Sequence, residues 1–270
     1  MRLINRRLSR GGAILAGIVP FALALAVYGI ASQARLSENP DDKLLPAFSS
    51  FAQAIDRMAL EPSRRTGEYL FWKDTLASLR RLAKGVAGAA AIGLVFGVSL
   101  GVIPWVGSHL SPFVRALSMI PPMAILPVLF IVFGLGESAK VALIIIGSAP
   151  FLVREIEQRV RELPREQFIK AQTLGASSWQ IITRVVLPQI VPRLVDAVRL
   201  TLGSAWLFLI AAEAIASTEG LGYRIFLVRR YLSMDVILPY VVWITVLAFA
   251  LDALLRRVNG WVFPWYGRAT

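Results

Sequence analysis

Cysteine is absent from the 270 residues, and His109 is the single histidine. The first absence excludes disulfides, thiolate metal sites and cysteine nucleophiles, and the second argues against a histidine metal cluster or a Ser-His-Asp site. The chain also lacks a GxxxxGK[ST] phosphate loop, an HExxH motif and a GxSxG motif. We therefore expect no catalytic residue, no metal site and no cofactor in this chain.

Acidic residues are scarce beside basic ones, at 17 Asp and Glu against 29 Lys and Arg, which gives a formal net charge of +12. No nucleic-acid-binding motif accompanies this charge. The excess therefore predicts contact with anionic lipid headgroups and loops retained on the cytoplasmic side of a membrane.

Apolar residues make up 56% of the sequence, and the mean hydropathy is +0.64. This composition is typical of a polytopic membrane protein and not of a soluble domain. We predict an all-α fold, with residues 1–270 as a single transmembrane domain and a core over residues 85–258. The predicted spans are residues 11–31, 86–103, 117–133, 139–153, 195–216 and 236–255.

The N-terminus resembles a signal peptide, because Arg2, Arg6, Arg7 and Arg10 precede the apolar residues 11–31. The apolar stretch is longer than a signal core, and no clear small-residue cleavage site follows it. The sequence therefore predicts an uncleaved first span. Six spans put both termini on one side, which the positive-inside rule assigns to the cytoplasm. The bases that support this are Arg154, Arg159, Arg161, Arg165, Lys170, Arg184, Arg193, Arg256 and Arg257.

Residues 32–84 form a predicted polar and amphipathic connection between the first two spans. Trp72 and Leu76 recur on one helical face, and Lys73 and Lys84 lie on the other. Such a helix can lie in the membrane interface or pack on the protein's own core, and the pattern favours neither. In the following span, the Gly93 and Gly97 spacing lets helix backbones approach closely.

A basic, polar stretch at residues 164–188 separates the fourth and fifth predicted spans. Pro164 is suited to a helix start, and Gly175 accepts the left-handed conformation that ends helices. Ser177 and Gln180 have capping-box spacing for a second helix, and Pro188 is expected to break it. The stretch predicts a helix–glycine–helix hairpin with small residues at its bend.

This hairpin resembles the EAA loop, the cytoplasmic coupling loop of bacterial ABC importer permeases. Ala171 fits the second alanine of the family pattern, Gly175 the glycine, Val185 the aliphatic position and Leu187-Pro188 the end. Ile169 and Lys170 stand where the acid and the first alanine are usual. Other stretches resemble the nitrate, sulfonate and taurine branch of these permeases: residues 120–127, residues 133–137, Gly203, Ala205, Trp206, Glu213 and residues 220–222.

The resemblance implies a type I ABC importer permease core in the bacterial inner membrane. It implies as partners a second permease copy, two cytoplasmic ATPase subunits that bind ATP and Mg, an extracytoplasmic substrate-binding protein and membrane lipid. The ATPase-coupling residues it implies are Gln167, Ala171, Leu174, Gly175, Ala176, Ser177, Leu187 and Pro188. The substrate class it implies is a small anion such as a sulfonate, taurine or nitrate, with a neutral heterocyclic vitamin precursor as the alternative.

Prolines interrupt the third span, and irregular membrane helices survive where freed backbone groups meet protein or water. We therefore predict a translocation pathway lined by Met119, Ile120, Pro121, Pro122, Ser148, Ser204, Trp206 and Phe208. The alternative is that Pro121 and Pro122 only kink a packed helix. Glu213, near the end of the fifth span, is either a functional intramembrane acid or the partner of Arg224 in a structural ion pair.

Two other classes of function are alternatives to an importer permease. A membrane-embedded enzyme would need converging titratable groups, and the sequence offers no nucleophile–base pair. A scaffold that uses the hairpin only to recruit a partner would show the same hairpin without transport. Binding of an ATPase subunit separates the importer from the enzyme, and ATP-dependent uptake separates it from the scaffold.

Overall fold

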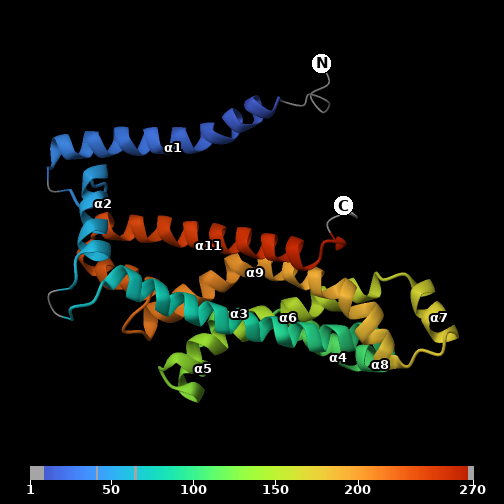
Figure 1. Cartoon of the computed structure of the whole chain (residues 1–270). Coiled ribbons are helices and arrows are strands. Elements are labelled where there is room, and N and C mark those ends of the chain that lie inside the picture. Colours follow the sequence, from blue (N-terminus) through green and yellow to red (C-terminus); the bar gives the residue numbers. More distant parts are fainter. Residues whose placement is uncertain (1–8, 41, 64–65, 267–270) are drawn as a thin grey trace. The chain divides into compact units, whose positions relative to one another are not determined.

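A computed structural model describes residues 9–40, 42–63 and 66–266, and this part of the chain contains helices and no strand (Figure 1). The chain divides into two compact units. One comprises residues 1–69 and 228–239, and the other comprises residues 70–227 and 240–270. Each unit is described by itself.

The first unit contains α1 (Arg10–Glu38), α2 (Phe48–Ile55), the π-helix η2 (Asp56–Leu60) and η5 (Arg229–Tyr231). The predicted first span lies within α1. The Tyr28 hydroxyl donates a hydrogen bond to the Pro46 carbonyl at 2.7 Å, and the Tyr28 and Phe48 rings pack with centroids 5.4 Å apart. These contacts hold the end of α1 against α2. The basic start of the chain, residues 1–8, lies outside the described residues.

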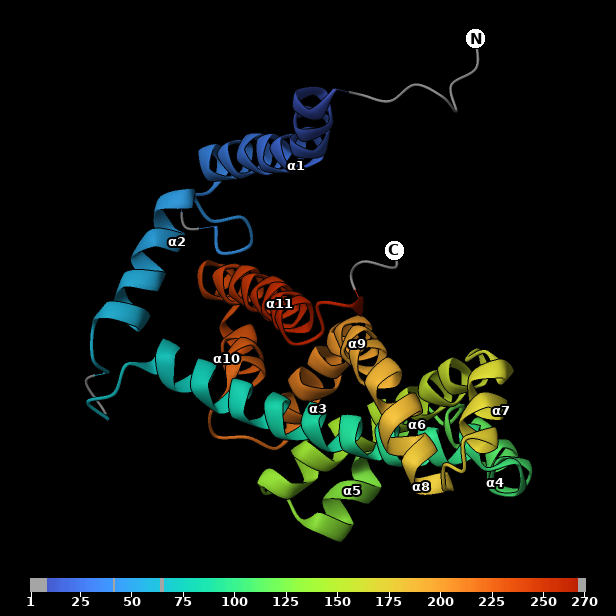
Figure 2. The same ribbon diagram turned by 45° about the vertical axis from the view of Figure 1, so that its right-hand side comes forward.

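The second unit is a bundle in which α3, α6 and α9 lie side by side (Figures 1 and 2). The hairpin helices α7 and α8 lie at one end of this bundle, and α10 lies at the other. The helices are α3 (Leu70–Val102), α4 (Pro104–Leu117), η3 (Pro122–Ile125), α5 (Leu126–Phe133), α6 (Glu137–Arg161), α7 (Arg165–Thr173), α8 (Ser178–Ile181), η4 (Ile182–Val186), α9 (Leu187–Ile215), α10 (Leu221–Val228) and α11 (Met234–Val262). Val228 of α10 and residues 234–239 of α11 belong to the first unit.

A row of glycines on α3 makes its close contact with α6. A Cβ atom added to Gly93 would lie 2.7 Å from Leu152, and one added to Gly97 would lie 2.6 Å from Ile156. A glycine further along α3 contacts a residue further along α6, so the two helices run parallel. The predicted close approach of helix backbones at Gly93 and Gly97 is confirmed, and its partner is α6.

Four helical stretches within the described residues are long and apolar enough to cross a membrane: Gly11–Glu38, Leu70–Val102, Ser178–Ile215 and Met234–Val262. The pair Pro104–Leu117 and Pro122–Phe133 is a fifth candidate, with a bend of 79° at its break. The predicted span 139–153 forms the apolar part of α6, whose last turns carry Arg154, Glu155 and Glu157. The helical polytopic fold is confirmed, and four or five of the described helices qualify as spans by length and composition alone, with α6 outside that count.

The predicted connection at residues 32–84 needs correction, and residues 104–112, between the second and third predicted spans, are helical. α3 begins at Leu70, so the amphipathic stretch is the first part of a long helix that packs on its own core. Its buried face carries Asp74 and Ser78, and the apolar face with Trp72 and Leu76 is about half exposed on the outer side of the helix. Residues 104–112 are helical because Pro104 stands at the first position of α4, where a missing N–H is harmless.

Pro188 does not break the helix, contrary to the prediction. α8, η4 and α9 run continuously, and the helix widens into a π turn just before the proline. In that turn the Leu187 N–H bonds to the Ile182 carbonyl, five residues earlier. The wider turn accommodates the proline ring, which would otherwise clash with a carbonyl of the preceding turn.

Candidate functional site

The hairpin at residues 164–188 has the predicted helix–glycine–helix form. α7 ends at Thr173, and Gly175 takes the left-handed conformation with φ of 79°. The Ala176 N–H then donates to the Ala171 carbonyl at 3.0 Å, which satisfies an acceptor left free at the end of α7. The bend is therefore fixed by backbone hydrogen bonds.

The second helix of the hairpin begins with the predicted capping box. The Ser177 hydroxyl accepts from the Gln180 N–H at 3.3 Å, and the Gln180 side chain accepts from the Ser177 N–H at 2.8 Å. These two bonds fix the direction in which the chain leaves the bend. The hairpin is thus rigid on both sides of Gly175.

The hairpin packs on the body of the bundle and also carries exposed apolar side chains. Phe168, Ala171 and Ala176 lie against the buried core that includes Val160 and Leu163. The hairpin also exposes three large apolar side chains that we name the hairpin patch: Ile169 (58% exposed), Leu174 (78%) and Trp179 (71%). Exposed large apolar side chains on an otherwise polar hairpin are typical of a surface that a partner covers.

The predicted coupling residues are brought together on this hairpin. Gln167, Leu174, Gly175 and Ser177 are exposed, and Ala171, Ala176, Leu187 and Pro188 are half-buried. The Gln189 amide also donates to the Gln167 amide oxygen at 2.9 Å, which ties α7 to the start of α9. Ile169 and Trp179 were not predicted as coupling residues, although large apolar residues in a polar stretch are a visible signal.

Comparison with known proteins decides which family this arrangement belongs to. Residues 91–268 match the family model described as "Binding-protein-dependent transport system inner membrane component". The chain belongs to this family. This permease is 33% identical over 196 residues to the taurine transport system permease protein TauC of Escherichia coli K12, covering 73% of this chain and 71% of TauC.

A second relative covers more of the permease. The bicarbonate transport system permease protein CmpB of Synechococcus elongatus is 30% identical over 260 residues, which is 92% of this chain and 88% of CmpB. Among solved structures, an inward-facing MetNI methionine ABC transporter has a chain of the same fold, with a TM-score of 0.64 and 23% identity. That similarity covers 73% of the permease and 97% of the other chain, and it confirms the type I importer permease fold.

The predicted pathway residues divide into two groups in this single chain. Met119 (79%), Ile120 (45%), Pro121 and Ser204 are exposed, and Pro122 is half-buried. Ser148, Trp206 and Phe208 are buried, and the Phe208 ring lies against Gly147. Pro121 and Pro122 lie at the 79° bend between α4 and α5, and the exposure of Met119 and Ile120 leaves this bend open to a partner or to water.

Two of the buried pathway residues carry polar atoms without a hydrogen-bond partner. These are the Ser148 hydroxyl on α6 and the Trp206 indole nitrogen on α9. Burying such a group unpaired costs about 1 to 3 kcal/mol, so natural proteins retain few of them.

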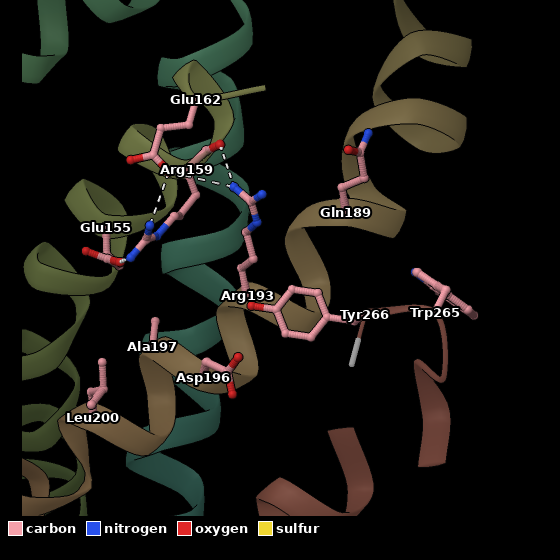
Figure 3. A pocket seen from close by; sticks show the side chains of 10 residues that line it. All are labelled: Glu155, Arg159, Glu162, Gln189, Arg193, Asp196, Ala197, Leu200, Trp265 and Tyr266. Carbon is pink, nitrogen blue, oxygen red and sulfur yellow. Dashed lines mark hydrogen bonds and ion pairs between the residues drawn. The ribbon is translucent and has the colours of Figure 1, made fainter. Parts of the chain in front are cut away.

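A cavity of about 520 Å³ lies at the base of the hairpin, between the ends of α6 and α9 and the segment after α11 (Figure 3). The Glu162 carboxylate forms ion pairs there with two arginines, Arg159 at 3.1 Å and Arg193 at 3.8 Å. Arg159 also binds Glu155 at 2.8 Å. These ion pairs join the base of the hairpin to both helices, so movement of the hairpin would reach α6 and α9 together.

The same cavity is closed on one side by Tyr266 (Figure 3). Burial, and after it the hydrogen bond with Asp196, raises the pKa of the Tyr266 hydroxyl. The hydroxyl therefore stays protonated at neutral pH and can donate to Asp196. This contact joins the segment after α11 to α9.

A buried polar cluster lies at the other end of the bundle, and it corrects the predicted Glu213–Arg224 pair. Glu213 is fully buried and binds Arg81 of α3, with Arg81 Nη1 at 2.7 Å from Oε1. The carboxylate also accepts from the Ser78 hydroxyl at 2.8 Å and the Gly222 N–H at 2.9 Å. The predicted pairing is wrong because the turn after α9 brings the Gly222 N–H, and not Arg224, to Glu213.

Arg224 instead binds Asp74, which is fully buried on α3, at 2.8 Å. Asp74 also accepts from the Gly220 N–H at 2.9 Å, and the Leu221 N–H donates to Ser78 at 2.9 Å. Three successive N–H groups at the start of α10 are thus held by side chains of α3 and α9. The cluster is fully hydrogen-bonded, which favours a structural role for Glu213.

Gly220 is required at this turn for two reasons. Its φ is 123°, and an added Cβ atom would lie 2.5 Å from the Glu213 carboxylate. We expect Gly220→Ala to lower the thermal unfolding temperature of the purified permease by several degrees, whereas Gly203→Ala, where nothing lies within 4 Å, should not. Equal melting temperatures for the two variants would contradict the geometry of this turn.

Proposed function

We propose that the permease drives import by docking a separate cytoplasmic ATP-binding subunit on its hairpin patch. The single observation that carries this is an exposed apolar patch on a hairpin that is capped, bent at Gly175 and anchored on the core. The ion pairs of Arg159 and Arg193 give the hairpin a mechanical connection to α6 and α9. ATP and Mg would be bound by the partner, since the chain has no phosphate loop.

The orientation follows from the charges at the hairpin end. Arg161, Arg165, Lys170 and Arg184 lie on or beside the hairpin. Positive segments are retained in the cytoplasm, so this end and both termini would face the cytoplasm of a bacterium. The end that carries α10 would then face the extracytoplasmic binding protein.

The proposed substrate is a small anion. TauC and CmpB are named for taurine and bicarbonate transport, and this chain carries a net charge of +12. No group of three or more Asp, Glu, His or Cys that could hold a metal ion occurs among residues 9–40, 42–63 and 66–266, which argues against a metal-ion cargo. Competition of uptake by a neutral heterocycle, and not by an anion, would favour the alternative substrate class.

A second permease copy would complete the pathway. The exposed Met119 and Ile120 at the α4–α5 bend offer apolar surface that a symmetric partner could cover. Cysteine crosslinking in membranes should trap a pair of chains. A monomer that transports in proteoliposomes would contradict the paired assembly.

Cysteine scanning tests the pathway, and the chain suits it because it has no native cysteine. Single cysteines at Ile120, Ser148 and Ser204 should react with a water-soluble thiol reagent, and trapped nucleotide states should change the rate at the buried Ser148. Ile18, on the apolar α1, provides a lipid-exposed control. Inert cysteines at all three positions in every state would remove the pathway assignment.

Binding of the ATPase subunit tests the proposed function directly. A candidate ATP-binding subunit from the same organism should co-purify with the wild type, and Trp179→Asp should reduce the recovered subunit about tenfold or more, because large aromatic anchors dominate interfaces. Trp261→Asp is a matched control, since Trp261 is also exposed and lies outside the hairpin. Equal recovery with both variants would show that the hairpin patch is not the docking surface.

A further inference from the structure

Lys84 is an unpaired positive charge at the edge of the apolar part of α3. It is exposed, and within the part of the chain that the structure describes it makes no ion pair. Lys140, which binds the cavity-lining Glu137 at 2.7 Å, is matched by that carboxylate. An ammonium group beside an apolar span without a partner is costly unless it faces water or a ligand.

Lys84 lines a cavity of about 560 Å³ between α3, α6 and the end of α5. The same cavity is lined by the hydroxyl-bearing Ser138 and by the apolar side chains of Val141, Ile145 and Phe133. Its walls thus combine one free cation and one hydroxyl group with an apolar surface.

The nearby carboxylate does not cancel the charge of Lys84. Glu137 also lines the cavity, but its two oxygens bind Arg81 at 2.6 and 2.8 Å and one of them binds Lys140 at 2.7 Å. Arg81 is shared with the buried Glu213 at 2.7 Å, so Arg81 and Lys140 together balance Glu137 and Glu213, and Lys84 is the positive charge in excess. A negatively charged ligand is therefore favoured in this cavity.

We propose that this cavity is a binding subsite for a small organic anion that has one compact charged head and a short apolar body. The head lies between the Lys84 ammonium and the Ser138 hydroxyl, and the body contacts Val141 and Ile145. Glu137 begins α6, so the cavity lies about 36 Å from the hairpin end of that helix. The proposal rests on the proposed function, in which this end receives the substrate.

The test uses the full-length Ser138→Cys permease in vesicles of neutral phosphatidylcholine, without ATPase. Its thiol is reacted with the anionic 2-sulfonatoethyl methanethiosulfonate and with the cationic 2-(trimethylammonio)ethyl methanethiosulfonate. For a separation on the order of 6 Å in water, Coulomb's law gives about a threefold change in each rate in opposite directions, so Lys84→Met should lower the anion-to-cation rate ratio about tenfold. Lys84→Arg should keep the ratio, and butanesulfonate should slow the anionic reaction.

Arg80→Met is the matched control, because Arg80 is exposed one turn earlier on α3 and does not line the cavity. An unchanged ratio in Lys84→Met, an inert thiol in the Ser138→Cys permease, or charge selectivity without protection by butanesulfonate would each overturn the subsite. Anionic lipid that abolished the reaction would assign the cavity to lipid headgroups and would also overturn it. Monodisperse Lys84→Gln gives the same comparison should Lys84→Met fail to fold.

This experiment can contradict the subsite without contradicting the proposed function, and the reverse also holds. Thiol labelling needs neither ATP nor a partner subunit, so charge-selective labelling can be found even where the permease does not couple to an ATPase. Conversely, intact ATP-driven uptake together with charge-insensitive labelling of the Ser138→Cys thiol would remove the subsite alone.

Discussion

Replacing Arg81 with methionine is expected to cause a large loss of stability in the permease. The change removes the cation that pairs with the fully buried Glu213, and it also breaks the ion pair between Arg81 and Glu137. Breaking a buried ion pair by removing one partner costs about 3 to 5 kcal/mol, which corresponds to a loss of about 10 °C or more in unfolding temperature. Thermal unfolding followed by size-exclusion chromatography measures the change.

Arg256→Met is the matched control for Arg81→Met. Arg256 also makes a short ion pair, with Asp252 at 2.6 Å, but its side chain is 67% exposed. Exposed pairs contribute little, so this variant should unfold close to the wild-type temperature. The double variant Arg81→Met/Glu213→Gln should recover part of the loss, and a strictly additive loss would contradict the direct pairing.

Gly175→Val is expected to abolish transport while the helices still insert into the membrane. Gly175 has a φ of 79°, and a β-branched residue is strained in that conformation, so the bend between α7 and α8 would change. The hairpin patch would then be displaced from its partner. ATP-dependent uptake and ATPase activity of the reconstituted complex should fall together to near background.

Two further variants distinguish the effect of a changed bend from a general effect of introducing a valine side chain. Gly260→Val introduces the same side chain on α11, where nothing lies within 4 Å, and should leave transport unchanged. Gly175→Asn should retain part of the activity, because asparagine accepts the left-handed conformation better than valine does. Wild-type uptake by Gly175→Val would show that this bend does not transmit the motion of the ATPase.

The hairpin could be predicted from the sequence because its signals are local. Pro164, Gly175 and the Ser177–Gln180 box lie within a short stretch and act on their own neighbourhood. The hairpin patch was missed because exposure depends on which side packs against the core. Phe168 turns inward and Ile169 outward, and no local rule distinguishes them.

The polar cluster could not be predicted in the same way because its contacts join distant parts of the chain. Arg81 and Glu213 are 132 residues apart, whereas Arg224 is near Glu213 in sequence and was the natural choice. The continuous helix through Pro188 was missed for another reason. A π turn relieves the proline clash without a break, and the sequence does not distinguish the two solutions.

ATP-driven uptake in proteoliposomes tests the central claim most directly. The permease is reconstituted with a candidate ATP-binding subunit and a candidate substrate-binding protein from the same organism, and labelled 2-aminoethanesulfonate is the probe. We predict accumulation that requires ATP on the hairpin side, and its loss in Gly175→Val. Equal accumulation without ATP, or in vesicles that hold the permease alone, would contradict the account.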